Sequence, residues 1–103
     1  MKILSESQIQ SKILTYLRKH YPSAVTWNLH EYHVFGVVGI PDILFITEGM
    51  TFFFEVKKPG EKPSRIQEVV LHKLQRNDII ADVVYGIQDV QRLLIQGGIN
   101  ACI

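Results

Sequence analysis

Cysteine and long apolar segments are nearly absent from this sequence, and both absences narrow what the chain can be. Cys102 is the single cysteine among 103 residues, so one chain can form neither a disulfide framework nor a thiolate metal site, which fits a reducing compartment. No apolar run approaches the roughly 20 residues that a membrane-spanning helix needs, and the first residues lack the apolar core of a signal peptide. We therefore expect a soluble, cytoplasmic protein with no membrane partner.

The sequence also lacks an excess of charge of either sign. Its 11 basic and 10 acidic side chains leave a net charge of +1, which excludes a broad basic surface of the kind that wraps nucleic acid. Hydrophobic residues make up 47% of the chain and charged residues 20%, as in a cored globular domain. Residues 1–103 are therefore expected to form one domain, small enough that a second copy would add to its stability.

Basic residues are nevertheless clustered in one stretch, at Lys57, Lys58, Lys62 and Arg65. Such a cluster predicts a local contact to DNA phosphates. The alternative is an ordinary solvated loop. The residues around the cluster decide between the two interpretations.

Two apolar runs beside this cluster predict a β-hairpin. The runs cover residues 43–46 and 51–56, and Glu48-Gly49 between them is typical of a two-residue turn. A turn of that length pairs the strands in a register that places Asp42 directly opposite Glu55, so the two carboxylates share a face. Lys57 lies two residues beyond Glu55 and points to the same face.

Carboxylates placed side by side repel each other and need a compensating cation. Oxygen ligands that converge in a small site suit Mg²⁺ or Mn²⁺. A neighbouring ammonium group, here that of Lys57, can hold a water molecule or stabilise charge that develops on a phosphate. This combination indicates chemistry rather than packing.

The same residues resemble the signature of the PD-(D/E)xK nuclease superfamily and, within it, of the VRR-NUC (virus-type replication-repair nuclease) family. The resemblance covers roughly residues 5–95. It rests on three segments, Gly39-Ile40-Pro41-Asp42-Ile43, Glu55-Val56-Lys57-Lys58-Pro59-Gly60 and Ser64-Arg65-Ile66-Gln67. It implies a restriction-endonuclease-like core, and a phage-encoded protein in a bacterial host fits it.

Two capping boxes mark the starts of helices, and each has a candidate site residue nearby. Ser5 precedes a helix whose apolar stripe includes Glu6, and the resemblance makes Glu6 a further metal or water ligand; the alternative is compensation of the helix dipole. Ser64 precedes a second helix with Gln67 at its third position. Gln67 caps this helix, and the resemblance also places its amide in the active site, where it orients Lys57, water or the phosphate.

Residues 24–29 and 32–38 predict two strands, with a turn at Glu31, and in the first of them apolar and polar side chains alternate. His30 and His33 would then point to opposite faces, and no further His or Cys lies near, which excludes a zinc site. The favoured interpretation of both is an ordinary surface histidine, and the functional alternative is that they contact DNA phosphate.

The predicted order of elements is α-β-β-β-α-β-α, an α/β fold with a mixed β-sheet flanked by helices. The helix after Ser64 would connect the strands at 51–56 and 80–85 and make them parallel. Phe53 shares the face of the carboxylates, and we expect a helix on each face of the sheet. Gly36 and Gly39 indicate a bulge or a close backbone approach, here by a DNA strand.

The resemblance implies a nuclease that depends on Mg²⁺ or Mn²⁺ and hydrolyses DNA phosphodiesters. Asp42, Glu55 and the backbone carbonyl of Val56 would hold the cation, Lys57 would position the nucleophile or stabilise the transition state, and the products would be a 5′-phosphate and a 3′-hydroxyl. Stand-alone relatives imply a homodimer that cuts branched DNA such as four-way (Holliday) junctions. The alternatives are a flap- or end-acting nuclease, a non-catalytic DNA-binding module and a small metabolic or structural protein whose acids are ordinary surface charges.

Overall fold

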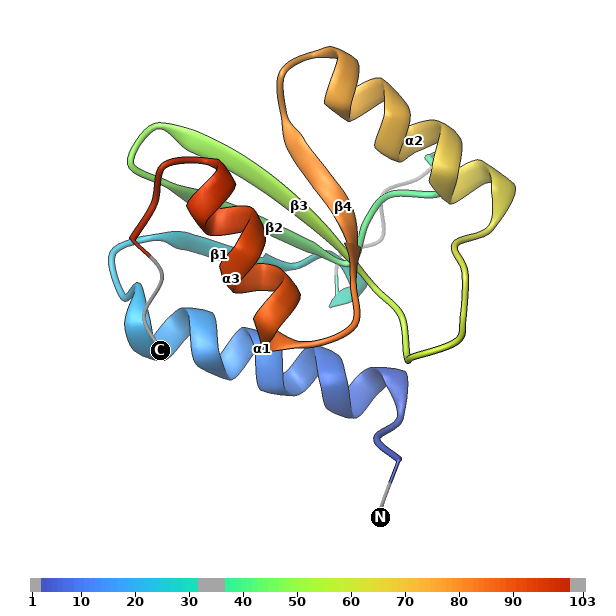
Figure 1. Ribbon diagram of the computed structural model, residues 1–103, viewed down its shortest axis with the longest axis horizontal. Helices are drawn as coiled ribbons and strands as arrows, with labels where there is room; N and C mark the ends of the chain where they lie inside the picture. The colour runs from blue at the N-terminus through green and yellow to red at the C-terminus, as the bar shows by residue number, and fades with distance from the viewer. Residues whose placement is uncertain (1–2, 32–36, 101–103) are drawn as a thin grey trace.

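The computed structural model of the chain describes residues 3–31 and 37–100, which form a four-stranded sheet flanked by three helices (Figure 1). In chain order the elements are α1 (Glu6–His20), β1 (Val25–Asn28), the 3-10 helix η1 (Leu29–Glu31), β2 (Ile43–Thr47), β3 (Met50–Val56), α2 (Arg65–Arg76), β4 (Ile80–Val84) and α3 (Ile87–Gln96). The predicted α/β class and the order of helices and strands are confirmed.

The sheet is mixed, with the strand order β1-β2-β3-β4. β1, β2 and β3 are antiparallel neighbours, whereas β3 and β4 run parallel because α2 crosses over between them, as predicted. In the β2–β3 hairpin Thr47 pairs with Met50 and Ile43 with Phe54, which is the predicted register. The turn residues Glu48 and Gly49 have φ angles of 50° and 77°, as a type I′ turn requires.

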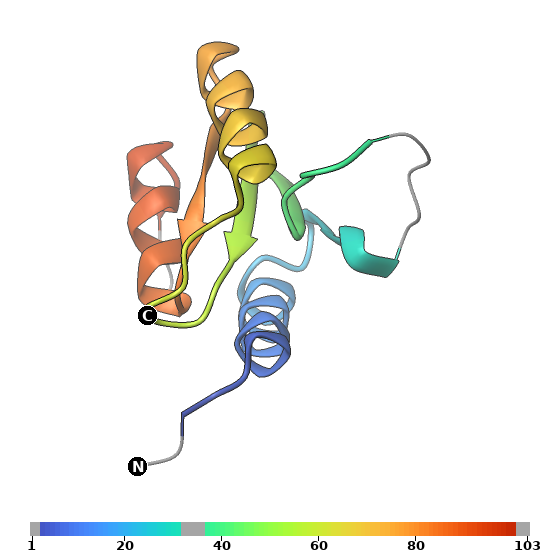
Figure 2. The same ribbon diagram turned by 90° about the vertical axis from the view of Figure 1, so that its right-hand side faces the viewer.

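Helices cover both faces of the sheet. α1 and α3 pack on the face that carries Phe52 and Phe54, whose side chains are fully buried in the main core. α2 lies over the opposite face, where its Leu71 is buried (Figure 2). The expected helix on each face is therefore confirmed, and Phe53 is half-buried on the α2 side.

Both predicted capping boxes form. At the start of α1, Ser5 Oγ accepts a hydrogen bond from the backbone N–H of Gln8 at 3.2 Å, and Gln8 Oε1 accepts one from the backbone N–H of Ser5 at 2.8 Å. Ser64 and Gln67 make the same pair of bonds at the start of α2, at the same distances. These bonds satisfy amide groups that a helix leaves without partners in its first turn, and they fix where each helix begins.

The segment between β1 and β2 differs from the prediction. β1 ends at Asn28, and η1 follows where a strand and then a turn at Glu31 were expected. Residues 32–36 of the second predicted strand lie outside the described residues, and Val37 and Val38 are not in a strand. A segment forms a strand only where a neighbouring strand takes up its backbone hydrogen bonds, and β2 already has β1 on one side and β3 on the other. In the part of the chain that the structure describes, no helix is both long and apolar enough to cross a membrane.

Candidate active site

The β2–β3 hairpin brings two buried carboxylates together. Asp42 directly precedes β2 and Glu55 is the second-last residue of β3, so the observed register continues to the predicted pairing of the two. Only 2% of Asp42 and 1% of Glu55 is exposed to solvent. Acidic side chains are almost never this deeply buried unless they are paired or bind a cation, which makes the two carboxylates a candidate cation site.

Asp42 is held by contacts from two neighbouring segments. Its Oδ2 accepts from the backbone amide of Val56 at 2.6 Å, and its backbone carbonyl accepts from the amide of Leu29 at 2.8 Å. Its Oδ1 contacts Nε2 of His30, which comes from η1. Asp42 therefore connects β3 to η1 and has little freedom to turn away from the site.

Glu55 has one partnered and one unpartnered oxygen. Its Oε2 lies 3.9 Å from Nζ of Lys57 and accepts from Nε2 of Gln67 at 3.4 Å. Its Oε1 is buried and has no hydrogen-bond partner among the described residues. A buried carboxylate oxygen without a partner is costly, which indicates that a proton or a cation belongs there.

The protonation of Glu55 reflects this environment. Burial, hydrogen bonding to Asp42 and the negative charge of Asp42, in that order of importance, together raise the pKa of the Glu55 carboxyl from its ordinary value of 4.5 to about 9. The ammonium group of Lys57 acts in the opposite direction but is too weak to reverse the shift. At neutral pH and without a cation, Glu55 therefore keeps its proton.

Gln67 caps α2, as predicted, and also contacts Glu55. Its Oε1 accepts from the amide of Ser64, while its Nε2 donates to Glu55. Because the helix cap fixes the carbonyl end of the amide, the donor end can only face the sheet. The first turn of α2 therefore positions Glu55 through a single side chain.

Glu6 approaches the site from the start of α1. Burial raises the pKa of its carboxyl, the charges of Asp42 and Glu61 raise it as well, and the charge of Lys57 lowers it. Charges act on one another this strongly only at short range. The structure thus brings Glu6 into the electrostatic neighbourhood of Asp42 and Lys57, as the resemblance implies.

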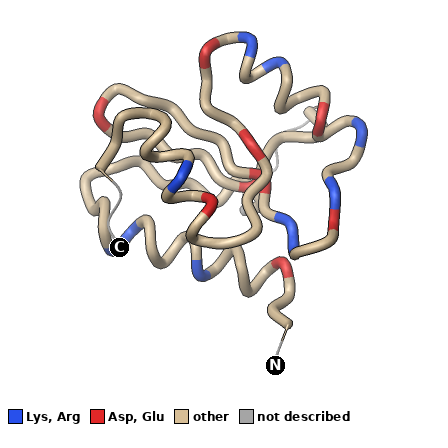
Figure 3. Tube along the Cα trace, viewed as in Figure 1, with Lys and Arg blue, Asp and Glu red and all other residues tan. Residues whose placement is uncertain are grey.

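The predicted basic cluster lies along the loop that joins β3 to α2 (Figure 3). Lys58 is exposed and makes an ion pair with Glu61 at 3.3 Å, and Lys62 and Arg65 are exposed too. Lys57 differs from them, because only 13% of its side chain is exposed and it faces Glu55. The cluster therefore divides into one site residue and three surface cations.

Of the two histidines predicted to be candidate site residues, the structure places only one. His33 lies outside the described residues. The side chain of His30 is 61% exposed but has one ring nitrogen against Asp42. His30 belongs to η1 and not to a strand, so the strand geometry from which its orientation was predicted does not apply. The structure places it at the rim of the carboxylate pair.

The structure explains why glycine is needed at position 39, which the sequence alone did not reveal. Its φ of +81° lies in the region that favours glycine, and a Cβ built there would come within 2.5 Å of Ile66 Cγ2 and 3.0 Å of the Ile66 carbonyl. The close backbone approach expected at Gly39 is real, but the neighbour is the first turn of α2 and not a DNA strand. Gly39 thus packs the segment before Asp42 against the helix that carries Gln67.

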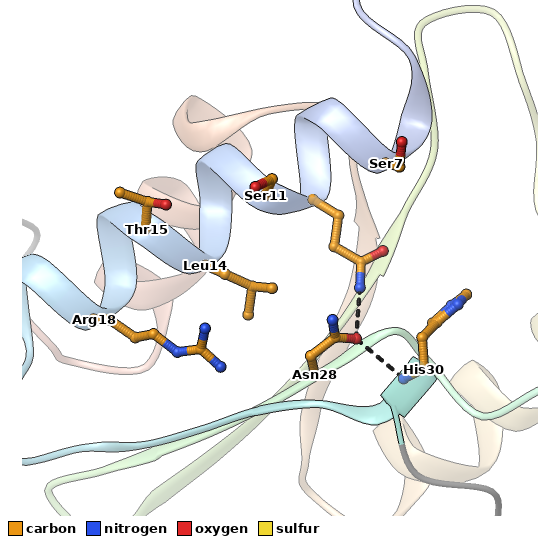
Figure 4. Close-up of a pocket in the computed structure, with 8 residues that line it drawn as sticks. Ser7, Ser11, Leu14, Thr15, Arg18, Asn28 and His30 are labelled. Carbon is orange, nitrogen blue, oxygen red and sulfur yellow. Dashed lines mark hydrogen bonds between the residues drawn. The ribbon is translucent and has the colours of Figure 1, made fainter.

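The sequence reasoning missed Gln10 and Asn28. Gln10 is 9% exposed, its Nε2 donates to Asn28 Oδ1 at 2.8 Å, and the same oxygen accepts from the backbone amide of His30 at 3.1 Å (Figure 4). This chain of bonds connects α1 through β1 to η1. Gln10 lies one helical turn after Glu6, and that spacing is the signal that could have revealed it.

The donor set suits a hard divalent cation. Within residues 3–31 and 37–100, no group of three or more His, Cys, Asp and Glu side chains is placed to hold a metal ion. Mg²⁺, however, is commonly held by one or two carboxylates, with water and substrate phosphate as its other ligands. Asp42 and Glu55, whose Oε1 has no partner, fit that description. A valine side chain has no atom that can bind a metal, so only the backbone carbonyl of Val56 could join them.

A comparison with solved structures finds a match over most of the chain. A structure described as a VRR_NUC domain superposes with a TM-score of 0.67 at 21% sequence identity, over 90% of this chain and 97% of that one. No family model matches the sequence, and no curated protein matches it. The match supports the resemblance drawn from the sequence motifs, and the chain therefore has the restriction-endonuclease-like fold of a VRR_NUC domain.

Proposed function

We propose that this chain is a DNA endonuclease that depends on Mg²⁺ or Mn²⁺ and hydrolyses phosphodiester bonds in branched DNA. The observation that carries the proposal is the buried pair Asp42 and Glu55, with Lys57 beside it and one carboxylate oxygen left without a partner. A DNA-binding module has no use for two adjacent acids next to a polyanion, because they repel phosphate. The fold of a VRR_NUC domain supports the same function.

Each residue of the site has a separate task in this proposal. Asp42, Glu55 and the Val56 carbonyl would hold the cation, which when bound supplies positive charge to the phosphate and lowers the pKa of a coordinated water. Lys57 stabilises charge on the phosphate oxygens as the water oxygen bonds to phosphorus. The P–O3′ bond breaks and the 3′ oxygen takes up a proton, leaving a 5′-phosphate and a 3′-hydroxyl.

Glu6 and Gln67 act around this centre. Gln67 holds Oε2 of Glu55 and so leaves Oε1 for the cation. Glu6 lies in the field of Lys57 and Asp42, where it orients Lys57 or a water molecule. Lys58, Lys62, Arg65, His30 and His33 contact the DNA backbone around the site.

Four-way junctions are the proposed substrate, and a homodimer is the proposed active form. The residues that the structure describes carry one carboxylate pair per chain, whereas resolving a junction requires two paired incisions. A two-fold dimer supplies two sites in a fixed relation. Sedimentation at micromolar concentration tests this part of the proposal, and a monomer that still resolves junctions would contradict it.

The activity is tested by incubating labelled four-way junction, flap, single-stranded and linear duplex DNA with Mg²⁺, Mn²⁺ or EDTA. Asp42→Asn and Lys57→Ala are compared with wild type, and Asp89→Asn on α3 is the matched control for a changed acid away from the site. Paired junction nicks that require the cation and are lost in both site variants support the proposal. Cleavage of flaps or ends alone would keep the chemistry and change the substrate. Binding without cleavage would make the chain a DNA-binding module.

A further inference from the structure

A groove of about 420 Å³ runs between α1 and the segment formed by β1 and η1 (Figure 4). Ser7, Ser11, Thr15 and Arg18 line it from the helix, and Asn28 and His30 line it from the other side. Its volume is in the range of about 300–1,000 Å³ that is usual for ligand sites. None of the tasks assigned above to the carboxylate site uses this groove, apart from the contact of His30 at its end.

On the helix side of the groove, hydroxyl groups are evenly spaced along α1. Ser7, Ser11 and Thr15 are spaced four residues apart, which places their hydroxyl groups about 6 Å apart along one face of α1. Arg18 continues the same face one turn later, and its Nη2 donates to the carbonyl of Thr26 at 3.5 Å. Among the described residues that line the groove, none is acidic. Hydroxyl groups and a guanidinium are among the groups with which proteins contact the phosphates of a nucleic-acid strand.

The opposite side of the groove is fixed and leads to the carboxylates. Asn28 accepts from the side chain of Gln10 on α1 at 2.8 Å and from the backbone amide of His30 at 3.1 Å. These bonds connect the β1 and η1 side of the groove to α1. His30 lines the groove and also contacts Asp42. A strand that lies in the groove would therefore arrive at Asp42 without leaving the protein surface.

We propose that this groove binds the sugar–phosphate backbone of the DNA strand on one side of the phosphate that is cut. The inference rests on the proposed nuclease function and adds a specific binding path to it. The segment that follows Lys57 carries Lys58 and Lys62 in the loop and Arg65 at the start of α2. In this proposal the two flanks of the cleaved phosphate are held differently, one by these cations and the other by a row of hydroxyl groups ending in Arg18. Contacts to phosphate carry no sequence information, so we expect binding in the groove to be independent of sequence.

The test measures binding of a fluorescently labelled four-way junction and a labelled single strand by anisotropy, in EDTA, between 50 and 200 mM salt. Arg18→Gln removes one phosphate contact. Between 50 and 200 mM salt, wild type should therefore lose about 3–4-fold more of its DNA affinity than the Arg18→Gln variant loses. Ser11→Ala with Thr15→Val should weaken binding at every salt concentration and leave the salt slope unchanged, because hydroxyl groups carry no charge. Lys19→Gln is the control, since Lys19 is exposed at the next position of α1 and does not line the groove. Equal effects of Arg18→Gln and Lys19→Gln would overturn the inference, since only general charge would then be acting.

A second measurement locates the strand. Thr15→Cys, in a chain with Cys102→Ser, is allowed to form a disulfide with DNA that carries a tethered thiol on successive phosphates. Cross-links should appear for phosphates on one side only of the cleaved position, and Lys19→Cys should give none. Cross-links at positions on both sides, or none from Thr15→Cys, would refute the groove path.

The cleavage assay separates this inference from the proposed function. If wild type cuts DNA while the Arg18 and Lys19 variants behave alike, the function stands and the groove path fails. If the groove variants change binding as expected but no DNA is cut, the nuclease function fails, and the groove remains a binding site for the DNA backbone without a cleaved phosphate beside it. If wild type binds no DNA at all, both fail.

Discussion

The protonation of Glu55 should make the metal-free protein less stable as the pH rises. Its pKa in the folded chain is about 9, against an ordinary value of 4.5 in an unfolded one. Between these two values the folded state binds a proton that the unfolded state has released. Stability from this proton is therefore complete below the lower value and is lost progressively as the pH rises through the upper one.

The size of the effect follows from the shift. With one more proton bound in the folded state, the free energy of unfolding falls by about 1.4 kcal/mol per pH unit, so by about 3 kcal/mol from pH 6 to pH 8. That is a large part of the roughly 5–15 kcal/mol that stabilises an ordinary domain. Glu55→Gln replaces the carboxyl with a neutral amide of the same shape and should remove this dependence.

Urea unfolding in EDTA at pH 6, 7 and 8 measures the effect in both proteins. The two proteins differ only in this one carboxyl group, so the difference between their free energies of unfolding reports on Glu55. That difference should grow by about 3 kcal/mol from pH 6 to pH 8 in favour of Glu55→Gln, a change in midpoint of roughly 1–3 M urea. Mg²⁺ at pH 8 should stabilise wild type but not the variant, because a cation replaces the proton. Parallel pH curves would refute the conclusion that Glu55 is buried as a neutral acid.

Three further substitutions test other parts of the structure. Gly39→Ala should destabilise the chain by about 2–4 kcal/mol in urea unfolding, since the new Cβ meets Ile66 and φ is positive, and a loss under about 0.5 kcal/mol would contradict that packing. Gln67→Ala and Ser64→Ala should each lower the free energy of unfolding by about 0.5–2 kcal/mol, because each removes part of the cap of α2. Only Gln67→Ala should also reduce DNA cleavage, and equal cleavage by the two variants would mean that Gln67 merely caps α2. Glu48→Asn should raise the thermal midpoint, with a gain of about 0.5–1 kcal/mol, because Asn tolerates the positive φ of the turn better; a lower midpoint would show that Glu48 has another role.

The parts of the fold that depend on short-range rules could be predicted from the sequence. The Glu48-Gly49 turn sets the hairpin register by itself, and that register places Asp42 opposite Glu55. Ser5 and Ser64 define helix starts through side chains only three residues away. These rules involve neighbours in the chain, so no tertiary information is needed.

The misplaced features depend on contacts between distant segments. The apolar pair Val37 and Val38 was predicted to lie in a strand, but nothing local shows that β2 already has two neighbours. Gly39 permits a close approach, yet the identity of Ile66 as the neighbour follows only from the packing of α2. The position of His30 against Asp42 depends on η1, which the apolar pattern does not distinguish from the end of a strand.

The two-residue turn between β2 and β3 also bears on the order in which the molecule assembles. A hairpin of this kind forms in about 1–10 μs, so Asp42 and Glu55 meet while both are still hydrated and their repulsion is weak. When α1 and α2 close over the hairpin and exclude water, two adjacent charges become costly, so at that step Glu55 must take up a proton or the pair must take up a cation. We therefore expect the late, packing steps of folding to be faster when Glu55 is neutralised, by acid or by a divalent cation. The chemistry of the site would then govern how quickly the chain reaches its native state.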